Sequence, residues 1–198
     1  MTFKVQDHYF NKAKKENFLA RSIYKLEEID QRFKVIKTGD TVLDLGYHPG
    51  SWIQYTSQKV GDKGKIIGID IKDINTRLSV LKNVQLFQKD IFDVQELSDL
   101  GVQAPFNTVL SDMAPNTTGI KSLDQDRSLI LIEAIFSLLP KFLGYNGKVV
   151  MKVFDSHGAQ VFLKDQKKLF NDYRFLKPKS TRSVSKEFFV IGKGYKKP

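Results

Sequence analysis

Four charged residues of the type that handle protons lie in separate stretches of the chain: Lys25 in YKL, Asp112 in LSDMAPN, Lys152 in VVMKVF and Glu187 in SKEFFVI. Lys152 is the most informative, because a charge inside an apolar run costs free energy unless it is paired or functional. Two lysines and two carboxylates beside a cofactor could orient a hydroxyl group and help to remove its proton. The pattern predicts a reaction centre if the fold brings the four stretches together.

Taken singly, the other three residues also fit ordinary structural roles. Lys25 could be a solvated residue on a helix, one turn after Arg21. Asp112 could cap the turn that follows it, and Glu187 could protect an edge strand from unwanted pairing. The role of Lys152 is open in another sense. It could act as a base, if burial or a second cation such as Lys25 favours its neutral form, or as an ammonium group that only orients an oxygen.

A glycine-containing turn, VLDLGYHPGSW, lies between the first two of these stretches. Asp44 and Gly46 end a predicted strand, and Gly50 stands at the predicted start of the next helix. Glycine at these places permits a tight turn and close approach of a ligand to the backbone. The turn lacks the G-x-G-x-x-G pattern of dinucleotide sites, so a nucleoside without a pyrophosphate is the favoured ligand.

Two further carboxylates follow predicted strands where a nucleoside would need them. Asp70 could accept hydrogen bonds from both ribose hydroxyls, and Asp90 could accept one from an adenine amino group. A single aspartate at a strand end is most often a cap or turn residue. Aspartates after each of the first four strands favour a binding site instead. Trp52 could be plain core packing, but beside the glycine turn we expect its ring to form a wall of the cofactor pocket.

The elements that would position these residues alternate between helices and strands. Apolar spacing predicts helices at 17–33, about 50–60, 129–143 and about 158–170, and β-rich runs predict strands at 41–45, 65–70, 84–87, 107–112, 148–154, 173–178 and 187–193. Such alternation predicts an α/β fold with a mostly parallel sheet and helices on both faces. The short link between the last two strands predicts an antiparallel hairpin. We expect one domain over 1–198, with residues 1–16 as a basic N-terminal arm.

The chain has 198 residues, a net charge of +10 and a pI near 9.6, which suggests a polyanionic partner such as nucleic acid. The positive residues form two clusters: Lys12, Lys14, Lys15, Arg21 and Lys25 near the start, and Lys177, Lys179, Arg182 and Lys186 near the end. With no Cys and only 3 His, a metal site is not expected. No apolar run approaches a membrane span. We expect a monomeric, soluble intracellular protein, in the cytoplasm or in an organelle that contains ribosomes.

Over nearly its whole length the chain resembles the FtsJ (RrmJ) family of S-adenosylmethionine-dependent RNA 2′-O-ribose methyltransferases. VLDLGYHPGSWIQY is similar to that family's VLDLGxxPGGW motif, and SDMAPNTTG, VVMKVF and SKEFFVI match its later motifs in order. Tyr47, His48 and Ser51 depart from the family pattern. The resemblance implies a Rossmann-like methyltransferase fold with a seven-stranded sheet, and catalytic residues at Lys25, Asp112, Lys152 and Glu187. It also implies cofactor contacts at Gly50, Trp52, Asp70, Asp90 and Asp112.

The favoured function is therefore transfer of a methyl group from S-adenosylmethionine to an RNA ribose, since only RNA carries the 2′-hydroxyl. Within the family, SDMAPN is more similar to the ribosomal RNA branch than to the tRNA branch, which tends toward SDGAPD. We expect ribosomal RNA or the large ribosomal subunit as partner. The alternatives are a tRNA 2′-O-ribose methyltransferase and a noncatalytic RNA-binding ribosome-assembly factor. An NAD-dependent oxidoreductase is disfavoured by the missing dinucleotide pattern.

Overall fold

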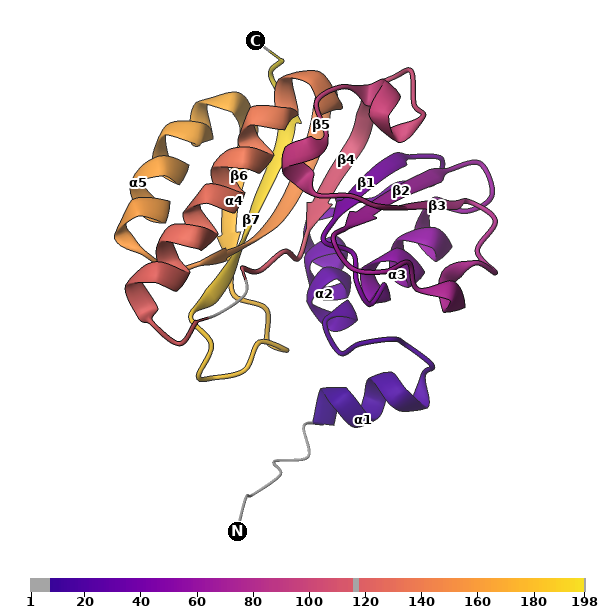
Figure 1. Ribbon diagram of the computed structural model, residues 1–198, viewed down its shortest axis with the longest axis horizontal. Helices are drawn as coiled ribbons and strands as arrows, with labels where there is room; N and C mark the ends of the chain where they lie inside the picture. Colours follow the sequence, from indigo (N-terminus) through magenta and orange to yellow (C-terminus); the bar gives the residue numbers. More distant parts are fainter. Residues whose placement is uncertain (1–7, 116–117, 198) are drawn as a thin grey trace.

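A twisted seven-stranded sheet forms the centre of the computed structural model, which describes residues 8–115 and 118–197 (Figure 1). The strands lie in the order β3-β2-β1-β4-β5-β7-β6. Their bounds are β1 Thr41–Leu45, β2 Lys65–Asp70, β3 Val84–Gln88, β4 Phe106–Ser111, β5 Leu143–Phe154, β6 Phe170–Leu176 and β7 Glu187–Tyr195. All pairs from β3 to β5 are parallel, whereas β7 pairs antiparallel with both β5 and β6. This confirms the predicted fold class, including the C-terminal hairpin.

Helices cover both faces of the sheet. In Figure 1, α4 (Lys121–Phe142) and α5 (His157–Gln166) lie over the near face, and α2 (Ile23–Phe33) and α3 (Ser51–Val60) lie behind it. The short helix α1 (His8–Lys15) lies below, against the start of α2. Short 3₁₀ turns at Thr76–Leu78, Ile91–Asp93, Leu97–Leu100 and Lys167–Leu169 complete the described elements.

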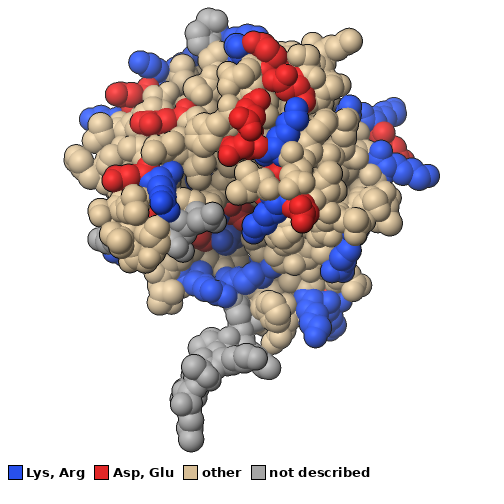
Figure 2. Space-filling model, in the orientation of Figure 1, with Lys and Arg blue, Asp and Glu red and all other residues tan. Residues whose placement is uncertain are grey.

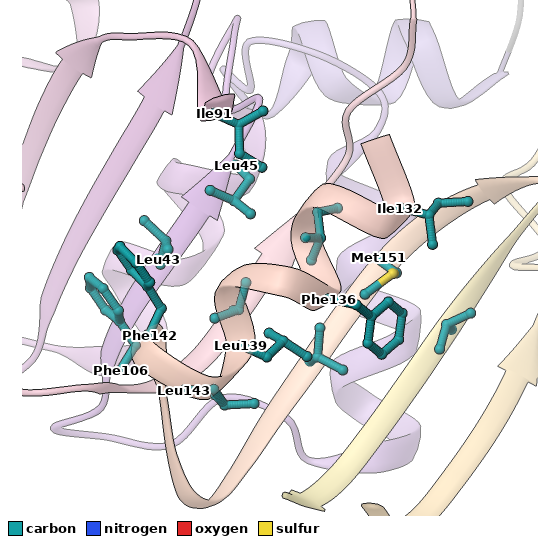
Figure 3. Close-up of a cluster of buried hydrophobic side chains, with 14 of the residues drawn as sticks. Leu43, Leu45, Ile91, Phe106, Ile132, Phe136, Leu139, Phe142, Leu143 and Met151 are labelled. Carbon is teal, nitrogen blue, oxygen red and sulfur yellow. The ribbon is translucent and has the colours of Figure 1, made fainter. Parts of the chain in front are cut away.

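Two hydrophobic cores, one on each side of the sheet, hold the layers together. Successive side chains in a strand point to opposite faces, so Val42 packs toward α2 and α3 while Leu43 and Leu45 pack toward α4. Figure 3 shows the second core, in which Phe136 and Leu139 of α4 lie over Met151. Strands buried on both faces must be apolar throughout, which explains why runs such as TVLDL and KVVM could be recognised in the sequence.

The sheet has a switch point between β1 and β4. From β1 the chain moves outward through β2 to β3, and it then returns to β4 on the other side of β1. In sheets of this kind, ligands bind outside the carboxyl ends of the strands at the switch point. The glycine turn after β1 and Asp112 after β4 therefore lie on the two sides of the expected ligand site.

Several helix boundaries differ from the predicted ones. The helix predicted over 17–33 begins only at Ile23, because Asn17 has a positive φ of 60° and the Leu19 amide donates to the Gln54 side chain instead of a helical carbonyl. Residues 8–15 of the predicted basic arm are helical, whereas residues 1–7 lie outside the described residues. Helix α4 begins eight residues earlier than predicted, at Lys121 rather than Leu129, and α5 ends four residues earlier, at Gln166 rather than Phe170.

The strand predicted to begin at Lys148 is assigned from Leu143, which pairs with Phe106. Asn146, expected to close the connection between α4 and this strand, has a φ of 60° and lies where the register shifts. Regular pairing with β4 resumes at Lys148. The Asn-Gly pair is thus an irregularity within the assigned strand rather than the loop before it.

Candidate active site

A cleft of about 320 Å³ opens at the carboxyl ends of β1 to β4. Residues that follow each of these strands line it: Gly46 and His48, Asp70 to Lys72, Lys89 to Phe92, and Asp112 to Pro115, with Leu131 of α4. The predicted site residues Gly46, Asp70, Asp90 and Asp112 are thus brought together. Gly50 and Trp52 do not line this cleft.

The two glycines of the turn permit close packing that no other residue would allow. Gly46 has a φ of +71°, and an added Cβ would lie 2.3 Å from Cγ of Met113. Gly50 has a φ of +112° and caps α3, and its Cβ would lie 2.4 Å from Leu78. Gly50 therefore shapes the start of α3, where unpaired backbone N–H groups favour polar or anionic ligand groups.

Asp70 fixes the loop after β1 while it faces the cleft. Its Oδ2 accepts from the His48 amide and its Oδ1 from the Lys72 amide, each at 2.9 Å. Each carboxylate oxygen has a second lone pair, so Asp70 can still accept from two hydroxyls of a ligand. Asp90 accepts from the Phe92 amide at 3.1 Å and thereby caps a 3₁₀ turn, as the ordinary role of an aspartate would have it. It nevertheless lines the cleft as well.

Asp44 is a buried carboxylate that makes no hydrogen bond within the described part of the chain. It is 0% exposed, and both of its carboxylate oxygens are unpartnered. Burial raises the pKa of Asp44 well above its usual range, and the nearby carboxylates of Asp112 and Asp70 raise it further. An unpaired buried acid is costly, so its position two residues before Gly46 suggests that a cationic group of a ligand compensates it. The sequence showed that Asp44 ends a strand, but not that it lacks a partner.

Trp52 corrects one of our predictions. Its side chain lies in the core between α2, α3 and the sheet, 2% exposed, with its ring 5.9 Å from that of Phe189. The indole nitrogen donates to the Ser22 carbonyl at 2.9 Å, and the Ser22 and Ser51 hydroxyls lie 2.9 Å apart. The ring does not wall the cleft, because its hydrogen-bonding partner lies on α2. Instead it joins the start of α3 to the start of the helix that carries Lys25.

The four predicted catalytic residues form two ion pairs. The Lys152 amine lies 3.0 Å from Oδ1 of Asp112 and also donates to the Asp112 carbonyl. The Lys25 amine donates to Oε1 of Glu187. Each lysine is thus matched by a carboxylate, and all four side chains are at most 20% exposed. Lys25, proposed from the sequence as a cation acting on Lys152, has Glu187 as its direct partner.

The register of β5 and β7 explains this arrangement. Lys152 is opposite Phe189, and Phe154 is opposite Glu187, so Lys152 and Glu187 are on the same face of the sheet. That face is the one covered by α2, which supplies Lys25. Ser111 pairs with Met151, so the next residue of each strand brings Asp112 beside Lys152. Asn116, the last residue of the SDMAPN motif, lies outside the described residues.

The two positive clusters meet at this edge of the sheet. Arg21 donates to the Ser180 carbonyl, and the Lys179 amide donates to Oε2 of Glu28 at 2.7 Å. Burial and the neighbouring Arg182 lower the pKa of Arg21, while Glu187 opposes this shift. In Figure 2, Lys and Arg side chains gather toward the lower part of the face beside a hollow, where Figure 1 shows α1 and the segment between β6 and β7.

Among residues 8–115 and 118–197, no group of three His, Cys, Asp or Glu is arranged to hold a metal ion. No helix in the described part of the chain is long and apolar enough to span a membrane.

A switch-point cleft edged by strand-end carboxylates, on a seven-stranded sheet with an antiparallel β7, defines the class as a Rossmann-like methyltransferase. The family model of FtsJ-like methyltransferases matches residues 18–195. The ribosomal RNA large subunit methyltransferase E of Bdellovibrio bacteriovorus is 46% identical over 97% of this chain and 98% of its own length. The protein of the same name from Syntrophobacter fumaroxidans is 42% identical, with 97% of each chain covered. The chain belongs to the FtsJ-like methyltransferase family, as the motifs predicted.

A solved structure agrees with the fold. The crystal structure of a Plasmodium falciparum protein provisionally named a ribosomal RNA methyltransferase superposes with a TM-score of 0.78. It is 25% identical, and the match covers 90% of this chain and 98% of that one.

Proposed function

We propose that the protein transfers a methyl group from S-adenosylmethionine to a ribose 2′-hydroxyl of large-subunit ribosomal RNA. The observation that carries the proposal is the meeting of two lysine–carboxylate pairs with the carboxylate-edged cleft at one end of the sheet. The cleft offers contacts for a nucleoside, and the pairs offer contacts for a polar group that approaches it. We further propose that residues 1–198 form a single RNA methyltransferase domain that acts as a monomer, because one chain supplies every one of these groups.

The residues around the cleft fit S-adenosylmethionine. Asp70 would accept from the two ribose hydroxyls, and Asp90 would accept from the adenine amino group. Ile91, Phe92 and Met113 supply the apolar walls that a base requires. Asp44 supplies the buried negative charge that a cationic methionine portion would satisfy. Since the Trp52 ring is in the core, any contact of Trp52 with the cofactor would use its backbone amide at the start of α3.

When bound, the cofactor supplies an activated methyl group on a positively charged sulfur. The protein must hold the ribose oxygen in line with that methyl group and let the hydroxyl proton leave as the new oxygen–carbon bond forms. Positioning of this kind can supply roughly 7–11 kcal/mol in favourable cases. Lys152 is the proposed contact for the ribose oxygen. Its ammonium group has three hydrogens, and with two directed at Asp112 the third is available for the substrate.

The choice of ribosomal RNA is supported by the names of the similar proteins, which specify the large ribosomal subunit. The SDMAPN motif, nearer to the ribosomal RNA branch than to the tRNA branch, points the same way. The net charge of +10 and its concentration at the mouth of the site suit a polyanionic substrate. Retention of both ion pairs argues against a noncatalytic assembly factor.

Two experiments test the proposal. Incubation with tritiated S-adenosylmethionine should label large-subunit RNA and leave tRNA unlabelled; labelled tRNA alone would identify the wrong substrate. In calorimetry, Asp70→Ala should weaken S-adenosylmethionine binding, whereas the neighbouring exposed Asp73→Ala should not. Binding of NAD in place of S-adenosylmethionine would show that the cofactor assignment is wrong.

A further inference from the structure

A second groove, of about 530 Å³, lies between α5 and the C-terminal hairpin. We call it the hairpin groove; its lining residues are Asp155, Gln160, Leu163, Lys164, Lys167, Tyr173, Phe175 and Phe188. It is next to the candidate reaction centre along the chain, because Phe188 directly follows Glu187 and Asp155 comes three residues after Lys152. Side chains alternate along a strand, so Phe188 and Glu187 point to opposite faces of the sheet.

An exposed aromatic wall forms one side of the hairpin groove. Phe175 contacts Tyr173 edge to face at a ring distance of 5.5 Å, and it contacts Phe188 in the same way at 5.6 Å. Phe175 is nevertheless 57% exposed, on the edge strand β6. Its two aromatic neighbours hold the ring in place, so one face is left available for a planar ligand.

The floor of the groove contains a polar group without a partner. Tyr173 is 9% exposed, and its buried hydroxyl makes no hydrogen bond within the described part of the chain. Most buried hydroxyls are hydrogen-bonded, and an unsatisfied one is costly. The Tyr173 hydroxyl can donate to or accept from a ligand that enters the groove.

Two cations complete the lining. Lys164 and Lys167 belong to the end of α5 and the turn after it, whereas the one acid of the lining, Asp155, already accepts from Gln160 at 2.7 Å. Aromatic faces combined with lysines are the means by which proteins hold single-stranded nucleic acid, with bases on the rings and phosphates on the cations. An apolar peptide would use the rings but would leave both lysines without a role.

We propose that the hairpin groove binds an unstacked nucleotide of the RNA substrate, adjoining the one that is methylated. Its base stacks on Phe175 within reach of the Tyr173 hydroxyl, and its phosphates contact Lys164 and Lys167. This site rests on the proposed function, since it assumes that RNA is the substrate. It would let the protein grip the strand on both sides of the β5 and β7 ends while the target ribose lies at Lys152.

The test uses the full-length protein and a short oligoadenylate that contains 2-aminopurine, whose fluorescence falls on stacking. Phe175→Ala should weaken binding by roughly 5- to 150-fold and remove the fluorescence change, and Phe175→Trp should retain both. Lys164→Gln combined with Lys167→Gln should lower the log–log salt slope by about 1.4. Tyr145→Ala is the matched control, because Tyr145 is 81% exposed but lies at the opposite edge of the sheet.

With large ribosomal subunits as substrate, Phe175→Ala should raise KM while kcat and S-adenosylmethionine affinity stay near wild type. Wild-type oligoadenylate affinity and wild-type KM in this variant would overturn the proposal. Unchanged oligoadenylate affinity with weaker binding to the assembled subunit would also overturn it, in favour of a protein partner. The oligoadenylate measurement requires no methyl transfer, so its failure is distinguishable from failure of the proposed function.

Discussion

Lys152 is the side chain on which the proposed chemistry depends most directly. Its substitution by alanine would remove the contact to the ribose oxygen and leave the Asp112 carboxylate without its cation. We expect kcat to fall by about 10²–10⁴-fold or more, while cofactor affinity and the far-ultraviolet circular dichroism spectrum stay near wild type. Single-turnover kinetics would measure the loss. Substantial turnover in Lys152→Ala would remove this residue from the catalytic set.

The arginine variant separates the two roles of Lys152. Arginine keeps the positive charge but does not readily lose a proton, so Lys152→Arg tests proton acceptance against orientation. A rate near wild type would eliminate proton abstraction by this residue. An inactive variant with normal cofactor affinity would favour it, once a crystal structure had shown that the larger side chain still contacts Asp112.

Asp44 gives a pH dependence of stability with a defined sign. Because burial raises the pKa of the folded carboxyl, the folded state holds its proton at pH values where the unfolded state has lost it. Stability therefore decreases as pH rises from the unfolded pKa, about 3.9, toward the raised folded pKa, by up to about 1.4 kcal/mol per pH unit. Asp44→Asn should lack this decrease in urea unfolding without cofactor. Parallel pH profiles for the two proteins would contradict the assignment.

At the scale of elements, Trp52 connects α3 to α2. Trp52→Phe keeps an aromatic ring in the core but leaves the Ser22 carbonyl without its donor. We expect the free energy of unfolding to fall by about 1–3 kcal/mol. Tyr195→Phe is a suitable control, because it removes a buried hydroxyl that has no partner in the described structure and should be nearly neutral. Denaturant unfolding of both variants would show whether the indole hydrogen bond matters; equal stabilities would show that it does not.

The sequence predicted the strands better than the helix ends, for a physical reason. β1, β2 and β5 are buried on both faces, so their sequences are apolar at nearly every position. The start of α2 depends instead on Gln54 of α3, which takes the Leu19 amide from 35 residues away. No local spacing shows such a contact. The same limit explains Trp52, whose partner Ser22 is 30 residues distant.

The candidate site was predictable where it follows strand ends and not where it depends on packing. Asp70 and Asp112 follow recognisable strands, so a parallel sheet had to bring them to one edge. The pairing of Lys25 with Glu187 requires α2 to cross that edge, which only the fold reveals. The unpartnered state of Asp44 and the hairpin groove likewise arise from packing between elements distant in sequence.

For the whole molecule, the arrangement of charge predicts how binding depends on salt. Replacement of Lys12, Lys14 and Lys15 by glutamine should flatten the salt dependence of RNA affinity, by about 0.7–0.9 log units per lost phosphate contact. Lys63, Lys65 and Lys82, exposed at the opposite edge of the sheet, provide a control with the same change in net charge. Filter binding over a salt series would measure both. Equal slopes would show that the basic helix α1 is only a solvated surface.

The position of the transferred methyl group tests the central claim most directly. Large ribosomal subunits would be labelled with tritiated S-adenosylmethionine, and their RNA would be hydrolysed with alkali, which cleaves next to a free 2′-hydroxyl but not next to a methylated one. We predict that the label appears in an alkali-resistant dinucleotide and that Lys152→Ala abolishes it. Label released on single nucleotides would place the methyl group on a base and contradict the ribose 2′-hydroxyl as the acceptor.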